Sequence, residues 1–164
     1  MAAPLHPLAT ANRLALGVPL LLIAGALGSQ YLGGLYPCEM CHWQRWPHYA
    51  AIVLAAIAFI IPGRDSRRVL VLAAAALIAA SGLIGVFHAG VEYGWWQGIT
   101  GCSTTVRSTG SAADMLDQIM NAPIIRCDVP QWTLAGVSLA GFNAILSLLG
   151  AGLVVRYATK LGRW

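Results

Sequence analysis

Charged residues are scarce in this sequence. Asp, Glu, Lys and Arg make up only 10% of its 164 residues, whereas they make up about 25% of a typical soluble domain. Hydrophobic residues make up 58% of the chain, so it could not cover a globular surface with polar groups. Its length suits one domain. We therefore expect a single membrane domain over residues 1–164.

The shortage of charge is greatest in four apolar segments, residues 14–32, 46–62, 69–89 and 132–155. About 20 apolar residues cross a bilayer as a helix. Helices also satisfy their own backbone hydrogen bonds in lipid, and no segment alternates like a barrel strand. The first segment is long for the apolar core of a signal peptide, so we expect it to remain as a helix. The prediction is an all-α integral membrane four-helix bundle.

The few basic residues are unevenly distributed. Seven of the ten precede the first segment, join the second to the third, or follow the fourth: Arg13, Arg64, Arg67, Arg68, Arg156, Lys160 and Arg163. The positive-inside rule then places both termini in the cytoplasm and the two loops, 33–45 and 90–131, outside. The net charge of +4 thus orients the chain in lipid, and we expect no binding of nucleic acid.

One segment of the second outer loop has a helical pattern, from Ser111 to Asn121. Ser111 and Asp114 have the spacing of a capping box. Four apolar residues share one face at helical spacing: Met115, Leu116, Ile119 and Met120. We expect a short amphipathic helix that either lies in the membrane interface or packs on its own loop.

All four cysteines lie in the outer loops, Cys38 and Cys41 in the first and Cys102 and Cys127 in the second. The compartment outside a bacterial inner membrane keeps thiols oxidised, so the even number indicates two disulfides. A bridge from Cys102 to Cys127 could staple a long loop. A bridge between Cys38 and Cys41 closes a very small ring and stabilises little, so this pair is typical of thiol exchange.

Cys41 precedes or enters the first turn of the second helix, where unpaired N–H groups and the helix dipole favour a thiolate. Arg45 follows one turn later, so its guanidinium can approach the sulfur or an anion beside it. An arginine where a helix enters lipid is a functional candidate, although it could also extend to the lipid headgroups. Glu39 would oppose a thiolate at either neighbouring cysteine if it is ionised and near.

Other chemistries also fit this stretch. Residues 38–42, CEMCH, match the signature of covalent haem attachment, but haem leaves Cys102 and Cys127 unexplained. A zinc site could combine Cys38 and Cys41 with His42 or with the cysteines of the other loop, although zinc would silence the thiols. Two purely structural disulfides in a membrane scaffold are a further alternative. We expect no bound metal.

The whole pattern resembles the bacterial disulfide bond formation protein B family, DsbB. PCEMCHWQR resembles that family's PCxxCxxxR stretch, and CDVPQWTLAGVSLAGFNAI resembles its segment leading into the last helix. The resemblance implies an inner-membrane thiol oxidase that reoxidises a periplasmic thioredoxin-fold oxidase of DsbA type and reduces a quinone, ubiquinone or menaquinone. A quinone oxidoreductase of the vitamin K epoxide reductase type is similar in chemistry but places its second cysteine pair differently.

The resemblance also implies a role for each cysteine. Cys102 and Cys127 form the disulfide that the partner's thiolate attacks, at Cys102. The freed Cys127 thiolate then attacks Cys38, which releases Cys41 as a thiolate facing the quinone. A better-stabilised thiolate is a better leaving group, which favours this order.

Two further residues are implied near the quinone. Arg45 would stabilise negative charge on the sulfur and on a quinone oxygen. His88 matches a histidine of some family members near the outer end of the third helix. It would contact the quinone or a proton path, or would simply be an interface histidine bonded to backbone or water.

Overall fold

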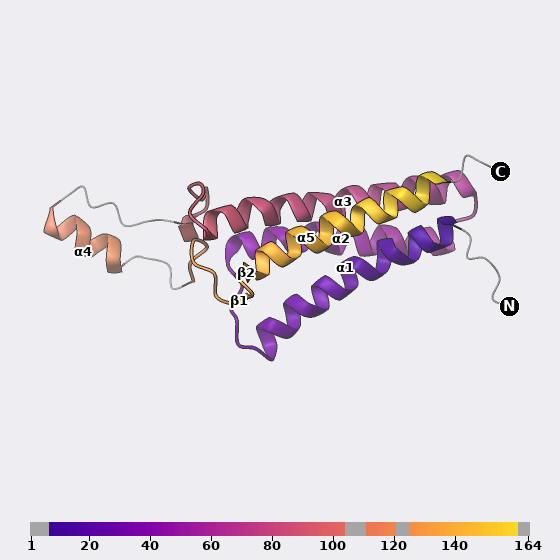
Figure 1. The fold of residues 1–164 in the computed structure, drawn as a ribbon. Helices are drawn as coiled ribbons and strands as arrows, with labels where there is room; N and C mark the ends of the chain where they lie inside the picture. Colours follow the sequence, from indigo (N-terminus) through magenta and orange to yellow (C-terminus); the bar gives the residue numbers. More distant parts are fainter. Residues whose placement is uncertain (1–6, 104–110, 121–124, 161–164) are drawn as a thin grey trace.

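Four long helices form an elongated bundle in the computed structural model, which describes residues 7–103, 111–120 and 125–160 (Figure 1). The helices are α1 (Pro7–Tyr31), α2 (Glu39–Ile60), α3 (Arg64–Glu92) and α5 (Leu139–Thr159). α2 and α5 each pack against both α1 and α3. Each of the first three helices begins several residues before the apolar segment expected from the sequence, because residues that include polar side chains form its first turns.

Three of these helices, α1, α3 and α5, are long and apolar enough to cross a membrane. α2 is not among them, because its first turns carry several polar residues: Glu39, His42, Gln44, Arg45 and His48. Large apolar side chains are exposed on the outside of the bundle, including Leu21, Ile60 and Leu149. The chain is thus a mostly helical, multi-pass membrane protein, and a fourth span at α2 remains a prediction.

The ends of the bundle differ in what they carry. α1 begins, α3 begins and α5 ends at one end, whereas the start of α2 and a short β-hairpin lie at the other (Figure 1). The termini of the described chain and the first cysteine pair are therefore at opposite ends. The predicted membrane topology requires this separation, although the orientation of the bundle in a membrane remains a prediction.

Small residues let α3 and α5 approach closely. A Cβ atom added at Gly85 would lie 3.0 Å from both the carbonyl oxygen of Ala140 and the backbone nitrogen of Ala144. A Cβ atom at Gly82 would lie 2.9 Å from the Leu148 side chain. Helices in membranes commonly associate through such small residues, and here they bring polar groups of α3 and α5 within hydrogen-bonding distance.

The segment predicted as the first turns of the last helix forms a β-hairpin instead. Strands β1 (Thr133–Leu134) and β2 (Val137–Ser138) pair antiparallel. The two residues between them, Ala135 and Gly136, have φ values of 51° and 78°, as in a type I′ turn. The helix therefore begins at Leu139 and not near Trp132, since the turn interrupts the apolar run.

Ser138 then starts α5. Its hydroxyl oxygen accepts a hydrogen bond from the N–H of Gly141 at 3.1 Å, as an N-cap does. The same hydroxyl donates to Glu92 at the end of α3. Tyr93 holds the hairpin from α3, because its hydroxyl donates to the Gly136 carbonyl and accepts from the Ser138 N–H. The hairpin and the end of α3 are thus one connected unit.

The helix expected in the second outer loop is α4 (Ala112–Met120). Ser111 and Asp114 form the predicted capping box, with hydrogen bonds of 2.9 and 3.3 Å between each N–H and the other side chain. The bonds from Ser111 lower the pKa of Asp114. Leu116 and Met120 are exposed. Four side chains of this helix lie outside the described residues, so its amphipathic character stays a prediction: Met115, Asp117, Gln118 and Ile119.

Candidate functional site

All four cysteines meet at the end of the bundle where α2 begins. Cys102 and Cys127 form a disulfide, and the Sγ atoms of Cys38 and Cys41 lie 2.7 Å apart as thiols. Cys38, Cys102 and Cys127 belong to one buried cluster, and Cys41 packs against it. Residues far apart in the sequence thus place a disulfide next to a thiol pair, which is the arrangement that thiol–disulfide exchange requires.

Cys38 occupies the N-cap position of α2. Its sulfur accepts a hydrogen bond from the N–H of Cys41 at 3.2 Å, so it takes the place that an oxygen has in an ordinary cap. An unpaired N–H at a helix N-terminus favours negative charge. The helix start therefore offers one backbone donor to the Cys38 sulfur.

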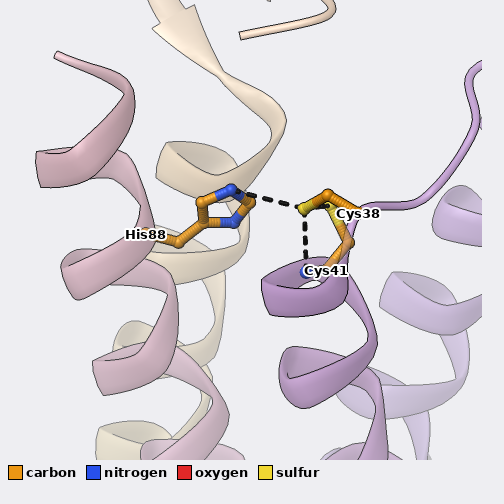
Figure 2. A group of neighbouring side chains, drawn as sticks. All are labelled: Cys38, Cys41 and His88. Carbon is orange, nitrogen blue, oxygen red and sulfur yellow. Dashed lines mark hydrogen bonds between the residues drawn. The ribbon is translucent and has the colours of Figure 1, made fainter. Parts of the chain in front are cut away.

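His88 faces this pair from α3 (Figure 2). Its Nε2 atom lies 3.6 Å from Cys38 Sγ and 3.8 Å from a carboxylate oxygen of Glu92. The backbone of Cys127 also makes a hydrogen bond with the ring. His88 is 2% exposed. This histidine therefore contacts one cysteine of each pair, and it is not a solvated interface residue.

The hydrogen-bond network fixes which nitrogen of His88 carries the hydrogen. The amide nitrogen of Gln44 donates to the Met40 backbone carbonyl at 3.2 Å and lies 2.7 Å from Nδ1 of His88. A carbonyl oxygen can only accept a hydrogen bond, so the Gln44 atom beside it is the amide nitrogen and not the amide oxygen. Nδ1 of His88 must therefore accept a hydrogen bond from this nitrogen. In the neutral ring the hydrogen is then on Nε2, which lies near the Cys38 sulfur, a carboxylate oxygen of Glu92 and the Cys127 backbone. His88 can thus donate to the Cys38 sulfur, in competition with these other acceptors.

Arg45 is nearly buried, with 9% exposure. Its guanidinium donates to the side-chain oxygen of Gln30 at 2.6 Å and to the carbonyl of Ala26 at 3.2 Å, both on α1. It therefore does not extend to the surface as a snorkelling side chain would. The predicted contact with the Cys41 sulfur is not among its hydrogen bonds, and its action on charge near Cys41 stays a prediction.

A cavity of about 330 Å³ opens beside the thiol pair. Its lining is mainly apolar and comes from the four long helices, the loop before Cys38 and the segment around Cys127. The polar groups that reach it include Cys38, Cys41, Arg45 and His88. Pockets for small organic molecules typically combine an apolar wall with a few polar groups. All the site residues predicted from the sequence line this cavity, except Cys102 and Cys127.

A buried polar network lies deeper in the bundle. The amide nitrogen of Asn143 on α5 donates to the Gln44 side chain at 2.8 Å and to the Ser81 carbonyl at 3.2 Å. Its amide oxygen lies 3.0 Å from His48 Nε2 and accepts from Ser147 at 3.0 Å. Gln44 and His48 were not predicted as site residues. Their spacing of four residues places two polar side chains on one face of a helix next to lipid, and this pattern could have identified them.

Arg126 lines the same cavity from the second outer loop. It forms an ion pair with Asp128, with nitrogen–oxygen distances of 2.8 and 2.6 Å. The Arg126 guanidinium lowers the pKa of Asp128 through these hydrogen bonds. Both residues flank Cys127, so this pair orders the backbone beside the disulfide.

One group among the described residues could hold a metal ion: Cys38, Cys41 and His88, with ligand atoms within 4.8 Å of one another. Thiolate and imidazole ligands suit zinc. His42 is exposed and is not part of this group. The zinc alternative therefore involves His88 in place of His42, and such a metal would occupy the groups that exchange needs.

Comparisons of the sequence with known proteins identify a family and two relatives. A family model described as disulfide bond formation protein DsbB matches residues 9–156. A disulfide bond formation protein B from Polaromonas sp. is 28% identical over 154 residues, covering 85% of this chain and 86% of its own. An uncharacterized protein, RP370, from Rickettsia prowazekii is 24% identical over 151 residues, covering 89% and 87%.

No solved structure matches the chain at a significant level. The family assignment therefore comes from sequence, and the location of the cysteines agrees with it. The matched region includes α2, α3, most of α1 and α5, and both cysteine pairs. The chain belongs to the DsbB family of disulfide bond formation proteins and is thus a membrane protein that takes part in disulfide bond formation.

Proposed function

We propose that this protein is a thiol:quinone oxidoreductase of the bacterial inner membrane that reoxidises a periplasmic thioredoxin-fold oxidase of DsbA type. One observation carries the proposal. A disulfide and a thiol pair share one buried cluster, and the thiol pair lines a mainly apolar cavity among the helices. Such an arrangement can accept electrons from a protein dithiol on one side and pass them to a small apolar acceptor on the other.

The exchange begins at the second pair. A partner thiolate attacks Cys102 Sγ, a mixed disulfide forms, and Cys127 leaves as a thiolate. The partner's second thiolate then displaces Cys102, so the partner is oxidised and Cys102 and Cys127 are reduced. With Cys38 and Cys41 as a disulfide, the Cys127 thiolate attacks Cys38 Sγ and Cys41 leaves. The Cys102 thiolate then attacks Cys127 Sγ and displaces Cys38. This restores the Cys102–Cys127 disulfide and leaves Cys38 and Cys41 reduced.

His88 assists the last part of this sequence. When Cys102 displaces Cys38 from Cys127, negative charge develops on Cys38 Sγ. The Nε2 atom of His88 and the N–H of Cys41 both lie within hydrogen-bonding distance of that sulfur, so both can donate to it. Hydrogen bonds to an ionised acceptor are about twice as strong as neutral ones, so these donors make Cys38 a good leaving group.

The cavity suits a quinone, ubiquinone or menaquinone. The Cys38 and Cys41 thiols would lose two electrons and two protons to a quinone held here, and this loss would restore their disulfide. The apolar lining fits an isoprenoid-bearing ring, and Arg45 has five N–H groups, of which two are used by Gln30 and Ala26. Arg45 can therefore donate to a ring oxygen without losing its anchor on α1. The family match favours this function over the vitamin K epoxide reductase type.

The expected topology accompanies the proposal. Both termini lie in the cytoplasm, the cysteine loops lie in the periplasm, and α2 forms a fourth span. The cysteine end would then meet its protein partner in the periplasm, while the cavity beside α1 and α5 would receive its acceptor from lipid. Basic residues before α1, in the α2–α3 connection and after α5 support this orientation.

The test is oxidation of a reduced DsbA-type protein by the purified chain with ubiquinone-1 or menadione. We expect quinone-dependent turnover with the natural chain. A Cys41→Ser variant should lose turnover, whereas a His42→Ser variant, changed at the next and exposed residue, should keep it. Equal turnover by the Cys41→Ser variant, or no turnover by the natural chain with either quinone, would contradict the proposal.

A further inference from the structure

Thr100 places a hydroxyl group beside the sulfur of Cys102. Its Oγ1 atom lies 3.0 Å from Cys102 Sγ, just before the short 3₁₀ helix η1 (Gly101–Ser103). A disulfide sulfur carries no hydrogen, so in this state only the hydroxyl can be the donor. Thr100 is 8% exposed and Cys102 is 9% exposed, so bulk water has little access to this bond. A buried donor at a sulfur that must later leave as a thiolate is a candidate for a part in the exchange.

Ser103 supports this donor. Its Oγ atom lies 2.9 Å from Oγ1 of Thr100. A hydroxyl oxygen can accept one hydrogen bond while its own hydrogen is donated elsewhere, so Ser103 can donate to Thr100 while Thr100 donates to the sulfur. The Ser103 N–H also bonds the Thr100 carbonyl at 3.0 Å, which closes the turn that carries both hydroxyl groups. A Cβ atom at Gly98 would overlap the Ser103 hydroxyl, so glycine leaves room for it.

The two sulfurs of the disulfide differ in their surroundings. Within residues 7–103, 111–120 and 125–160, a hydroxyl group bonds the sulfur of Cys102 but none bonds that of Cys127. Cys127 is also fully buried, whereas Cys102 keeps a small exposed area. A hydrogen bond to a thiolate stabilises it and makes it a better leaving group. Cys102 is thus the more accessible sulfur, and it has a hydroxyl donor when it leaves.

We propose that the Thr100 hydroxyl stabilises Cys102 as the leaving thiolate when the protein partner is released, and so favours release of the partner in its oxidised form. The inference rests on the proposed function and deepens it. In this step the partner's second thiolate bonds to the partner sulfur held by Cys102. The bond from that sulfur to Cys102 breaks, and its electron pair stays on Cys102 Sγ. Thr100 keeps its proton throughout and donates a hydrogen bond to the charged sulfur.

The hydroxyl distinguishes the two fates of the mixed disulfide. In the productive one, the partner's second thiolate displaces Cys102 and the oxidised partner departs. In the other, the Cys127 thiolate attacks Cys102 Sγ, the partner leaves reduced, and the starting disulfide returns. Cys102 becomes the leaving thiolate only in the productive reaction. Hydrogen bonds to an ionised acceptor are about twice as strong as neutral ones, so Thr100 lowers the barrier to this reaction more than the barrier to the return.

Four substitutions separate this role from a structural one. Thr100→Val removes the hydroxyl and keeps nearly the same shape, and Thr100→Ala is a second variant without the hydroxyl. Thr100→Ser keeps the hydroxyl and removes only the methyl group. Ser103→Ala is the matched control, because it removes the neighbouring hydroxyl and leaves the donor at Cys102 in place. A leaving-group role predicts that only the two variants without the Thr100 hydroxyl release the partner slowly.

The measurement is rapid mixing of a reduced DsbA-type protein with the full chain in detergent, after oxidation of the chain by ubiquinone-1. Acid quenching, thiol alkylation and non-reducing gels then follow the mixed disulfide and the oxidised partner. In Thr100→Val we expect the oxidised partner to appear roughly tenfold more slowly, the effect of one hydrogen bond to a charged group, while the mixed disulfide forms within about twofold of the natural rate. Thr100→Ser and Ser103→Ala should release the partner within about threefold of the natural rate.

The possible failures are distinguishable. If the natural chain yields neither a mixed disulfide nor an oxidised partner, the proposed function is wrong. If it yields both, but Thr100→Val and Thr100→Ala release the oxidised partner at the natural rate, the inference about Thr100 is wrong while the function stands. Equal slowing of formation and release in Thr100→Val, or release by Thr100→Ser as slow as by Thr100→Val, would indicate a structural role and would also overturn the inference.

Discussion

Cys38 Sγ lies 3.6 Å from Nε2 of His88, although fifty residues separate them in the chain. The contact joins the start of α2 to the outer part of α3 at the point where the disulfide Cys102–Cys127 also packs. Because Gln44 occupies Nδ1 of His88, the hydrogen of the neutral ring is on Nε2, the atom that faces the sulfur. The ring can therefore donate to Cys38 when charge develops there.

Replacing His88 by Ala should therefore slow the exchange between the two pairs. We expect kcat for partner oxidation to fall roughly tenfold, since one hydrogen bond to a charged group is worth about 1.5–3 kcal/mol. His88→Gln should keep more activity, because its amide nitrogen can still donate toward Cys38. Alkylation of the reduced chain at fixed pH provides a second measurement, and Cys38 should react more slowly in His88→Ala. Equal alkylation rates in both variants and the natural chain would contradict the assigned donor.

Arg45→Lys should raise KM for quinone while leaving KM for the protein partner unchanged. A lysine has one ammonium group in place of the planar guanidinium, so it cannot bond Gln30, Ala26 and a ring oxygen with the same geometry. We expect an increase of roughly tenfold, about the cost of one charge-assisted bond. Steady-state kinetics with each substrate varied in turn will measure it. Arg64→Lys, exposed at the start of α3, is the control, and an equal effect there would refute the role.

Sequence patterns located the helices and the cysteines but not the contacts between them. Four apolar segments mark the long helices because lipid-facing and core residues are apolar alike. Capping residues also marked α4, whose box of Ser111 and Asp114 is local. The predicted start of α5 was wrong, because Ala135 and Gly136 adopt positive φ values and form a turn inside an apolar run. An Ala residue gives no signal for such a conformation.

The deeper part of the site could not be predicted for a different reason. Its contacts join α2, α3 and α5 across sequence separations of 44 to 99 residues. No pattern within one segment reports which polar side chains will meet. Asn143 on α5 bonds Gln44 on α2 and Ser81 on α3, and this meeting follows only from the three-dimensional arrangement.

Ser138→Ala should destabilise the hairpin end of the bundle. The substitution removes the N-cap bond to Gly141, which typically costs about 1 kcal/mol, and also the donor to the Glu92 carboxylate. We expect a lower midpoint of unfolding in a denaturing detergent, with a loss of about 1–2 kcal/mol. Thr133→Ala, exposed in the paired strand of the same hairpin, should change the midpoint much less. A similar loss in both variants would show that the cap itself is not the cause.

Gly85, where α3 and α5 approach closely, permits a test that links helix packing to the site. Gly85→Ala places a Cβ atom 3.0 Å from two backbone atoms of α5 and 3.1 Å from the Asn143 amide nitrogen. Backbone atoms cannot rotate away, so the helices must separate, and overpacking of this kind costs about 1–3 kcal/mol. Gly17→Ala on α1 is the matched control, because its Cβ atom would meet nothing within 4 Å.

The two alanine variants should therefore change stability in opposite directions. Gly17→Ala should be neutral or stabilising by up to about 1 kcal/mol, since alanine favours the helix, whereas Gly85→Ala should lower the unfolding midpoint. Separation of α3 from α5 also moves Asn143 away from Ser81, which it bonds at 3.2 Å. Gly85→Ala should consequently lower turnover with a quinone even where the chain remains folded, because Asn143 also bonds Gln44, the residue that orients His88. Unchanged stability and turnover in that variant would mean that the helices tolerate the added methyl group and that their close approach does not hold the network together.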